Sequence, residues 1–348
     1  MTLRTRDQAD LVDAVLAFHL NAGVDFVLAV DHASVDGTAD VLGRYERAGH
    51  LRLFREEGEA IRLRRTKLAR LAATEYGADW ILHPDGDEVW WPRGGTWGEL
   101  LGAVPPRFGI VRGAWRHFAP RPDAERHVAE RMIARVTPAA ERTLPADPFH
   151  PGVKLAHRAH PEAIVHKGHR VSGPGLHVVR GWYPFEILHF PLRSREQARA
   201  KYASLSAGLE AGGLTVPAHV ATARGRLDDG SWDETYDSLV VDDAALERGL
   251  ADGTLACDTR LRDALRLLAG VDELPPGPRF RLPADGAPAL SFATGRAAEE
   301  AAYAIDLQVL QARESGARAA RRIGDLERRV DALAGSRVGR RLSRRRAL

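Results

Sequence analysis

The sequence predicts an α/β fold, in which a parallel sheet is covered by helices and followed by a helical C-terminal extension. Over the first ninety residues, short apolar runs alternate with segments of helical periodicity, one pair in roughly every 25 residues, which is the pattern of strand–helix–strand units. A glycine follows each predicted helix of this half, where helices commonly end. A long uninterrupted helical pattern near the C-terminus predicts the extension.

The predicted elements of the first half are short and follow one another closely. Strands are expected at residues 3–5, 25–30, 51–54 and 80–83, and helices at residues 10–22, 38–48 and 62–76. The first helix has its apolar residues three and four positions apart, which places them on one face (Leu11, Val12, Val15, Leu16 and Leu20). Pro84 cannot donate a hydrogen bond to a neighbouring strand, so the strand at 80–83 is expected to stop pairing there.

Beyond residue 92 the periodicity is less regular. Strands are expected at 109–111 and 186–190, a strand or short helix at 128–136, a loop-rich segment at 143–184, a helix at 194–209, short helical pieces over 211–290 and a long helix at 297–333. These elements predict three parts: an α/β domain at 1–210, a mainly helical and loop-containing extension at 211–296, and an amphipathic helix with a basic tail at 297–348.

The composition is that of a soluble globular protein. Of the 348 residues, 44% are hydrophobic and 28% are charged, which excludes a disordered chain. The single cysteine, Cys257, excludes an internal disulfide and suits a reducing compartment. No stretch approaches the roughly 20 apolar residues that span a bilayer, and the N-terminus lacks the apolar core of a signal peptide. A cytoplasmic location is therefore expected.

The basic charge of the chain is local. The net charge is +3 and residues 313–348 contain twelve arginines and four acidic residues, a balance of +8 that leaves −5 for the remainder. A basic tail on a mildly acidic body is not a nucleic-acid-binding footprint, so no nucleic-acid partner is expected.

Three acidic residues within four positions, Asp85, Asp87 and Glu88, follow the apolar run at 80–82. In an extended backbone residues two apart point the same way, so Asp85 and Asp87 are expected to face one ion while Glu88 faces elsewhere. Gly86 between them would let a ligand approach the backbone closely. Carboxylates at a strand end are suited to Mg²⁺ or Mn²⁺ carrying a diphosphate. The alternative is a solvated acidic turn.

A second polar stretch, residues 30–38 (VDHASVDGT), follows the predicted strand at 25–30. Asp31 at the strand end, followed by small polar residues such as Ser34, can accept hydrogen bonds from a nucleobase or ribose. Asp36 and Thr38 are alternatively helix caps. Neither G-x-G-x-x-G nor G-x-x-x-x-G-K-[ST] occurs in the chain, so bound phosphates would be held by a metal and basic side chains.

Basic candidates for the phosphates lie on the third predicted helix and in the later loops. That helix begins with Arg64, Arg65 and Lys67, which either bind the phosphates or, equally, form a solvated face of the helix. Lys154 is the candidate from the loop-rich segment. Five tryptophans near these stretches are candidates to stack on sugar rings or to fill the core (Trp90, Trp91, Trp97, Trp115 and Trp182).

Three stretches together resemble a known family. Residues 10–38, 64–92 (ending in DWILHPDGDEVWWP) and 186–202 (EILHFPLRSREQARAKY) are similar, in the same order, to the D-x-D-E branch of bacterial glycosyltransferase family 2. The resemblance covers roughly residues 3–205 and implies a GT-A fold, that is, a Rossmann-like mixed sheet with flanking helices. It also implies a nucleoside diphosphate-sugar donor and a Mn²⁺ or Mg²⁺ ion.

The same resemblance implies roles for individual residues. Asp31 and Asp36 would contact the nucleotide, and Asp85 and Asp87 would contact the metal and the diphosphate. Because many enzymes of this fold complete the metal shell with a histidine from a late strand, His189 in EILHF is the candidate third ligand. Its alternative is a buried core histidine.

An inverting transfer needs a general base that deprotonates the acceptor hydroxyl. The candidates are Glu186 and Glu130, each of which is alternatively an ordinary ion-pair partner. Glu88 is the third candidate, since it either faces the acceptor or pairs with a basic residue. A retaining mechanism would need no such base.

The C-terminal helix has three interpretations. Ile323, Leu326, Val330 and Leu333 are spaced 3, 4, 3 like a coiled-coil seam, which indicates self-association. The helix alternatively folds on the body, or its basic tail contacts anionic lipid at the inner face of the membrane.

The function predicted from the sequence is metal-dependent transfer of a sugar from a nucleoside diphosphate-sugar to a hydroxyl of a glycan, lipid or small molecule, with cell-envelope polysaccharide as one acceptor class. The alternatives are nucleotidyl transfer on a similar sheet, which would ordinarily have a glycine-rich basic loop near the first strand, and a carbohydrate-binding or scaffold protein without catalysis. Residues 4–10 (RTRDQAD) contain no glycine.

Overall fold

The computed structural model describes residues 1–334 apart from 57–64, 123–124, 139–148, 150–151, 167, 212–215, 217, 284–287 and 293–296. Arg64, one of the basic candidates, lies outside the described residues. The chain divides into two compact units, Met1–Gly295 and Arg296–Leu348. Residues 211–295 belong to the same unit as 1–210, and the finer division between these two segments stays a prediction.

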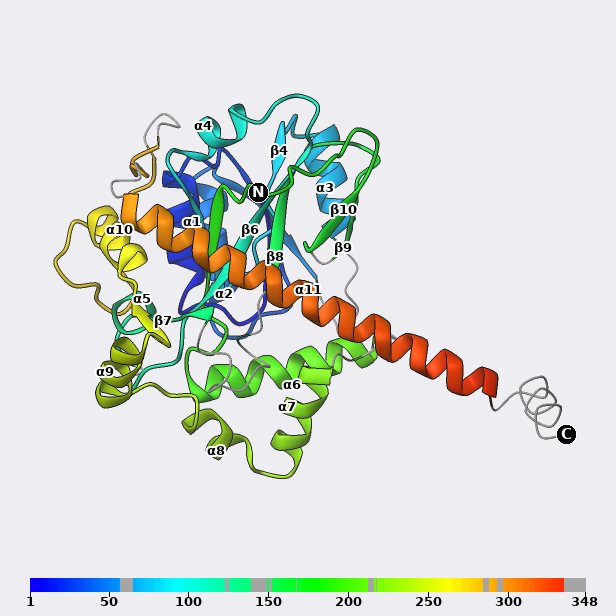
Figure 1. Cartoon of the computed structure of the whole chain (residues 1–348). Coiled ribbons are helices and arrows are strands. Elements are labelled where there is room, and N and C mark those ends of the chain that lie inside the picture. The colour runs from blue at the N-terminus through cyan, green and yellow to red at the C-terminus, as the bar shows by residue number, and fades with distance from the viewer. Residues whose placement is uncertain are drawn as a thin grey trace, which may run out of the picture. The chain divides into compact units, whose positions relative to one another are not determined.

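The first unit begins with the predicted strand–helix alternation (Figure 1). Its strands are β1 (Thr2–Thr5), β2 (Val27–Asp31) and β3 (Leu51–Arg55), and its helices are α1 (Val12–Asn21), α2 (Thr38–Arg47) and α3 (Arg65–Thr74). The three strands form a parallel sheet in the order β1-β2-β3. The predicted α/β class is therefore confirmed.

A second, mixed sheet has the strand order β4-β8-β6-β11-β5. Its strands are β4 (Trp80–Ile81), β8 (Val153–Arg158), β6 (Ile110–His117), β11 (Phe185–His189) and β5 (Glu88–Pro92). Only β6 and β11 pair in parallel; β4–β8, β8–β6 and β11–β5 are antiparallel. The segment after β4 runs beside β1, since Thr2 N donates to Leu82 O (2.8 Å) and Arg4 forms a parallel bridge with Asp85.

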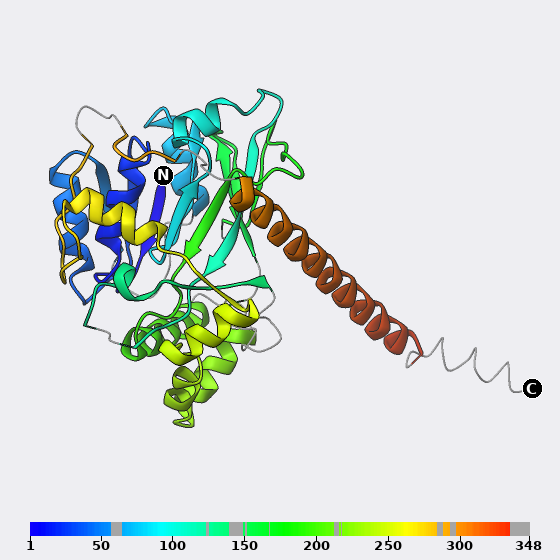
Figure 2. The same cartoon turned by 60° about the vertical axis from the view of Figure 1, so that its left-hand side comes forward.

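The remaining elements of this unit cover the sheets or form small additions. They are α4 (Trp97–Gly102), α5 (Val128–Arg131), β7 (Ala134–Val136), β9 (Ile164–His166), β10 (Arg170–Ser172), α6 (Arg195–Ala211), α7 (Ala218–Asp228), α8 (Trp232–Asp237), α9 (Asp243–Asp252), β12 (Leu255–Cys257) and α10 (Arg260–Ala269). Helices α6, α7 and α8 lie together below the sheets (Figures 1 and 2).

Three expectations about these elements were wrong or incomplete. The loop-rich segment at 143–184 also contains the strands β8, β9 and β10, which were not expected; the buried polar residues Lys154 and His157 interrupt the apolar pattern of β8. The segment at 128–136 contains both the helix α5 and the strand β7. The strand β5 was not expected, because its first residue, Glu88, belongs to the acidic motif.

Most of the tryptophans belong to the core. Trp90 and Trp97 are buried and pack against Phe185, the former stacked at 5.0 Å between ring centroids. Trp91 stacks on Phe18 of α1 at 5.2 Å. These contacts favour the packing interpretation over a sugar platform for these three residues.

Buried histidines make the fold sensitive to acid. His19 on α1 accepts a hydrogen bond from Trp90 N through Nε2 (3.1 Å), and its Nδ1 lies 2.7 Å from Val15 O. This arrangement needs the neutral ring, and burial lowers the pKa of His19 to about 4. Because the unfolded ring has a pKa near 6.5, the unfolded state binds the extra proton first as pH falls.

We therefore expect the free energy of unfolding to fall as pH drops from about 6.5 towards 4, with His19 contributing a slope of up to about 1.4 kcal/mol per pH unit. Urea denaturation between pH 7.5 and 5 measures this slope. The variant His19→Gln should have a shallower slope, whereas His166→Gln, at an exposed position of β9, should keep the wild-type slope. Equal slopes in all three proteins would contradict the role of His19.

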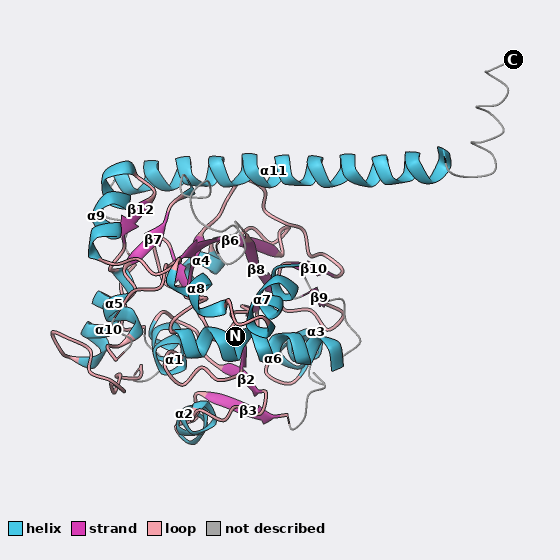
Figure 3. Cartoon of the chain, turned by 90° about the horizontal axis from the view of Figure 1, so that it is seen from below, coloured by secondary structure: helices cyan, strands magenta, loops and turns pink. Residues whose placement is uncertain are grey.

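The second unit contains the long helix α11 (Ala297–Ala334), which confirms the helix expected at 297–333. Figure 3 shows it as one continuous helix. Among the described residues, no helix is long and apolar enough to cross a membrane.

Candidate functional site

The candidate site lies where several strands end together. The parallel register places Thr5 of β1 beside Asp31 of β2, and the bridge between Arg4 and Asp85 brings the acidic motif to the same edge. Ligands of parallel α/β sheets bind outside the carboxyl ends of the strands. The two acidic stretches singled out in the sequence are therefore neighbours in space.

The acidic motif forms a tight turn rather than an extended segment. Glu88 N donates to Asp85 O (3.1 Å), which closes a turn over Gly86 and Asp87. A Cβ atom on Gly86 would lie 2.8 Å from Cγ of Gln8 and 3.2 Å from Cγ2 of Thr5. The expectation that Gly86 leaves room for a ligand was wrong, because these two side chains fill that space.

The turn also changes which carboxylates lie together. Asp85 and Glu88 share the ammonium group of Lys154, at 2.5 and 2.7 Å, whereas Asp87 contacts Lys201 on α6 at 2.6 Å. The expectation that Asp85 and Asp87 face one ion and Glu88 faces elsewhere was therefore wrong. The reversal of the chain at Gly86 is the physical reason.

Arg65 completes the cluster around Asp85. It is buried at the start of α3, forms an ion pair with the Asp85 carboxylate and donates to His83 O (2.9 Å). Burial alone would raise the pKa of Asp85. The positive charges of Arg65 and Lys154 together outweigh this effect, so the pKa lies well below its usual range. Asp85 is therefore a carboxylate that holds two cations at the sheet edge.

Glu88 is held by donors on every side. Both indole groups nearby donate to it, Trp90 Nε1 at 3.1 Å and Trp115 Nε1 at 2.9 Å, and Asp85 N donates at 3.0 Å. With Lys154 these contacts fix the carboxylate in a buried position. The geometry favours pairing with a basic residue over the role of base for Glu88.

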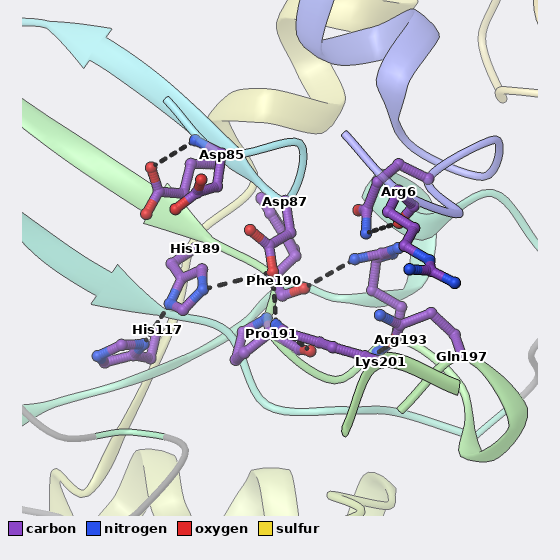
Figure 4. A network of polar contacts seen from close by, with 12 residues as sticks. Arg6, Asp85, Asp87, His117, His189, Phe190, Pro191, Arg193, Gln197 and Lys201 are labelled. Carbon is purple, nitrogen blue, oxygen red and sulfur yellow. Dashed lines mark hydrogen bonds and ion pairs between the residues drawn. The ribbon is translucent and has the colours of Figure 1, made fainter. Parts of the chain in front are cut away.

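Asp87 lies in a second cluster, which includes His189 (Figure 4). The Asp87 carboxylate lies 3.6 Å from His189 Nε2, and His189 Nδ1 lies 3.0 Å from His117 Nδ1. The His189 ring stacks on Trp115 with 5.1 Å between ring centroids. Burial alone would raise the pKa of Asp87, but the Lys201 ammonium group and the nearby His189 ring together outweigh this effect, so that the pKa is well below the usual range.

The loop after β2 is tied to the loop after β1. Ser34 Oγ donates to the buried carboxylate of Asp31. Asp36 accepts hydrogen bonds from Thr38 N (3.0 Å) and from Ala9 N (2.8 Å). The N-cap residue of α2 is Gly37, so neither Asp36 nor Thr38 caps the helix, although Asp36 accepts from the first amide of the helix. These bonds tie the two loops together beside Asp31.

Basic residues that were not singled out in the sequence also lie at this edge. Arg4 of β1 donates to His32 Nε2 (3.0 Å through Nε), and His32 Nδ1 lies 3.0 Å from Glu56. Arg193 is fully buried and binds Asp10 through two hydrogen bonds of 2.6 and 2.9 Å. Lys201 and Arg193 lie in residues 186–202, the third stretch that resembles the family. Their place in this stretch was the only sign in the sequence that they belong to the site.

Glu186 and Glu130 lie apart from the acidic turn. On β11, Glu186 points to the face opposite that of His189, and its oxygens contact Arg116 (2.7 Å), Arg93 (2.9 Å) and Arg260 (2.6 Å). These contacts favour the ion-pair alternative for Glu186.

Glu130 on α5 binds Arg266 of α10 through two hydrogen bonds of 2.7 and 2.6 Å and accepts from Leu274 N (2.9 Å). Burial raises the pKa of Glu130, but the bond from Arg266 and its other contacts lower it below the ordinary value. A carboxylate with a lowered pKa is a poor base, and this one joins two helices instead.

The donor set determines how a metal ion would fit. Among the described residues, no group of three or more histidine, cysteine, aspartate or glutamate side chains is arranged to hold an ion. Asp85 is neutralised by Arg65 and Lys154. Asp87 and His189 are the two predicted ligands that lie together, and two protein ligands suffice where substrate phosphates complete the shell of Mg²⁺ or Mn²⁺.

Comparison with known proteins gives distant structural similarity only. No family model and no curated protein matches the chain. The chain is similar to S. aureus TarS 1-349 (13% identity, TM-score 0.27, covering 59% of this chain and 64% of that one). It is also similar to the same protein in complex with UDP-GlcNAc (13%, TM-score 0.29, 59% and 65%) and to the longer S. aureus TarS (13%, TM-score 0.28, 59% and 39%).

The chain thus spans less than two thirds of the solved chains that it resembles. TM-scores this low carry no argument about function. A functional conclusion therefore depends on the residues of the site itself.

Proposed function

We propose that the protein is a glycosyltransferase that moves a sugar from a nucleoside diphosphate-sugar to a hydroxyl of a glycan, lipid or small-molecule acceptor. The observation that carries the proposal is the gathering of Asp31, the acidic turn and several buried cations at the carboxyl edge of the sheet. The resemblance of residues 3–205 to glycosyltransferase family 2 supports the same class.

Charge and hydrogen-bonding groups support placing the donor at this edge. Asp31 and Ser34 offer hydrogen bonds to the ribose or base, and Asp36 fixes the loop that holds them. Arg65 and Lys154 offer positive charge to the diphosphate, and Asp85 orients both of them. Because guanidinium and ammonium groups bind phosphate oxygens well, these two are the preferred diphosphate contacts.

The Mn²⁺ or Mg²⁺ ion belongs to the proposal at Asp87 and His189. When bound there it would offset the negative charge that develops on the departing diphosphate. Lys201 now contacts the Asp87 carboxylate and would have to move aside for the ion. Metal binding would therefore be an exchange of the ion for the Lys201 ammonium group at Asp87.

Inversion of configuration at the anomeric carbon stays a prediction. The stereochemistry of the product tests it. None of the three candidate glutamates is assigned as the base, because each is engaged by cations or by several hydrogen-bond donors. For the acceptor and the location, we propose a lipid-linked or envelope acceptor at the cytoplasmic face of the membrane.

The proposal is tested by thermal shift with UDP-, GDP- and dTDP-sugars, with and without Mn²⁺. One donor should stabilise the protein by about 2.7 kcal/mol at a hundredfold excess over its Kd, and more strongly when Mn²⁺ is present. The variant Asp87→Asn should keep the nucleotide effect and lose its dependence on Mn²⁺. Asp40→Asn, an exposed position on α2, should behave as wild type.

The outcomes separate the two parts of the proposal. If no nucleotide-sugar stabilises the wild-type protein, the glycosyltransferase proposal fails. If one does, but with the same Mn²⁺ dependence in Asp87→Asn as in wild type, the donor site stands and the assignment of the metal is wrong.

A further inference from the structure

The long helix α11 exposes large apolar side chains to solvent. Ile305, Ile323, Leu326 and Val330 are 61, 56, 50 and 62% exposed. The helix α11 belongs to the second compact unit. An exposed row of aliphatic side chains on one helix marks an interaction surface.

The row is part of a regular heptad pattern. Eight successive seam positions are separated by 4, 3, 4, 3, 4, 3 and 4 residues: Ile305, Val309, Ala312, Gly316, Ala319, Ile323, Leu326 and Val330. All eight are small or apolar. The mean spacing of 3.5 residues is that of a left-handed coiled coil, whereas a straight helix repeats every 3.6.

The seam is narrow, which argues against a lipid surface. Between residues 313 and 330 the large apolar residues, Ile323, Leu326 and Val330, all lie on the seam. Outside it, Asp325 and Arg328 form an ion pair of 2.5 Å between exposed side chains. A helix that packs on a body or enters a lipid interface presents a wider apolar face, while a strict two-position stripe is the surface of a coiled-coil helix.

The residues on the seam indicate the partner and its orientation. In the heptad, Val309, Ile323 and Val330 occupy position a, and Ile305 and Leu326 occupy position d; Ile323, Leu326 and Val330 thus form a run with branched residues at a and leucine at d. Branched residues at a with leucine at d favour two parallel strands. Ala312, Gly316 and Ala319 let the two helix backbones approach closely in the middle.

The charges beside the seam agree with a parallel pair. Arg322 and Glu327, both exposed, occupy position g of one heptad and position e of the next. In a parallel, in-register dimer these positions of the two copies face each other, so two Arg322–Glu327 pairs would flank the seam. We propose that two copies of this chain associate through a parallel coiled coil of α11, with its seam from Ile305 to Val330.

Light scattering after size-exclusion chromatography tests the association on the full-length protein. At a protein concentration of about 50 µM, the measured mass should be twice the 38.1 kDa of one chain. Ile323→Glu should shift the dissociation constant upwards by at least tenfold. Gln311→Glu, which adds the same charge at an outward position of the heptad, should leave the dimer intact.

Charge exchange and cross-linking test the orientation. Arg322→Glu and Glu327→Arg should each weaken the dimer several-fold, and the double variant should restore it. With Cys257→Ser removing the only cysteine, Leu326→Cys should form a covalent dimer on oxidation if the helices are parallel and in register.

The contrary outcomes are equally clear. A monomer at 200 µM would overturn the proposal. Sedimentation of a monomer with anionic vesicles, lost in Ile323→Glu, would assign the stripe to lipid instead. The parallel coiled coil would be excluded if the dimer forms but the charge variants do not weaken it and Leu326→Cys does not form a covalent dimer.

Discussion

Replacing Lys154 by methionine is expected to lower the free energy of unfolding by about 3–5 kcal/mol, the usual range when one partner of a buried ion pair is removed. The Lys154 side chain is 1% exposed, and its ammonium group lies 2.5 Å from Asp85 and 2.7 Å from Glu88. Methionine has a similar length and fills the space, so that the loss reports the charge. Glu88 would be left buried with neutral donors only.

Urea denaturation at pH 7.5 measures the effect, and Lys201→Met is the matched control. Lys201 also contacts an acid of the turn, Asp87, but its side chain is 25% exposed, so its loss should destabilise the protein less than the loss of the fully buried Lys154. The double variant Lys154→Met/Glu88→Gln should regain part of the stability, because it removes the carboxylate that was left unpaired. Equal losses for the two lysines would contradict the assignment.

The difference between Lys154 and Lys201 shows how the chain stabilises three acidic residues within four positions. The repulsion within the motif suggested that a cation belongs there. The protein itself supplies Arg65 and Lys154 to Asp85 and Lys201 to Asp87. A metal ion would therefore exchange with a protein cation instead of filling an uncompensated acidic site.

The sequence predicted where the acids lie, but not which way they face. Short apolar runs alternating with helical periodicity place Asp31 and Asp85 at strand ends, and the structure confirms both positions. The turn over Gly86 depends on the packing of Gln8 and Thr5 against it. Those contacts join distant parts of the chain, and no local pattern reports them.

The same limit explains the strand that was missed. β8 contains two polar residues, Lys154 and His157, that are buried because they meet Glu88 and His83 in the folded protein. A periodicity argument treats such residues as solvent-facing. Buried polar pairs of this kind are found only when both partners are in view, and here they lie at the centre of the candidate site.

Glu186→Gln gives the second large effect, since the change should lower the free energy of unfolding by about 3–5 kcal/mol. Three guanidinium groups surround the carboxylate, and the contacts to Arg116 and Arg260 measure 2.7 and 2.6 Å. Burial alone would raise the pKa of Glu186. The positive charges of Arg260, Arg116 and Arg93 together outweigh this effect, so the pKa lies well below its usual value. Glutamine keeps the size and removes the anion that these three guanidinium groups share, while Arg260 still contacts Asp258 (2.7 Å).

The pH dependence of this loss follows from the direction of the shift. A carboxyl group whose pKa is lower in the folded protein stabilises it above the unfolded pKa of about 4.3, and that contribution disappears as pH falls through the folded pKa. The difference between wild type and Glu186→Gln should thus be constant from pH 6 to 9 and shrink below about pH 4. Urea denaturation across this range measures it.

Arg260→Gln is the control that separates an ion-pair network from a catalytic base. That variant leaves Glu186 with Arg93 and Arg116, so it should be less destabilising than Glu186→Gln. Turnover of the donor found by thermal shift, measured where both variants are folded, should change by less than about tenfold in either. A loss of 10²-fold or more in Glu186→Gln alone, with wild-type stability, is the size of effect that removing a base produces. That result would restore Glu186 as the base and show that the buried arginines position it for proton transfer.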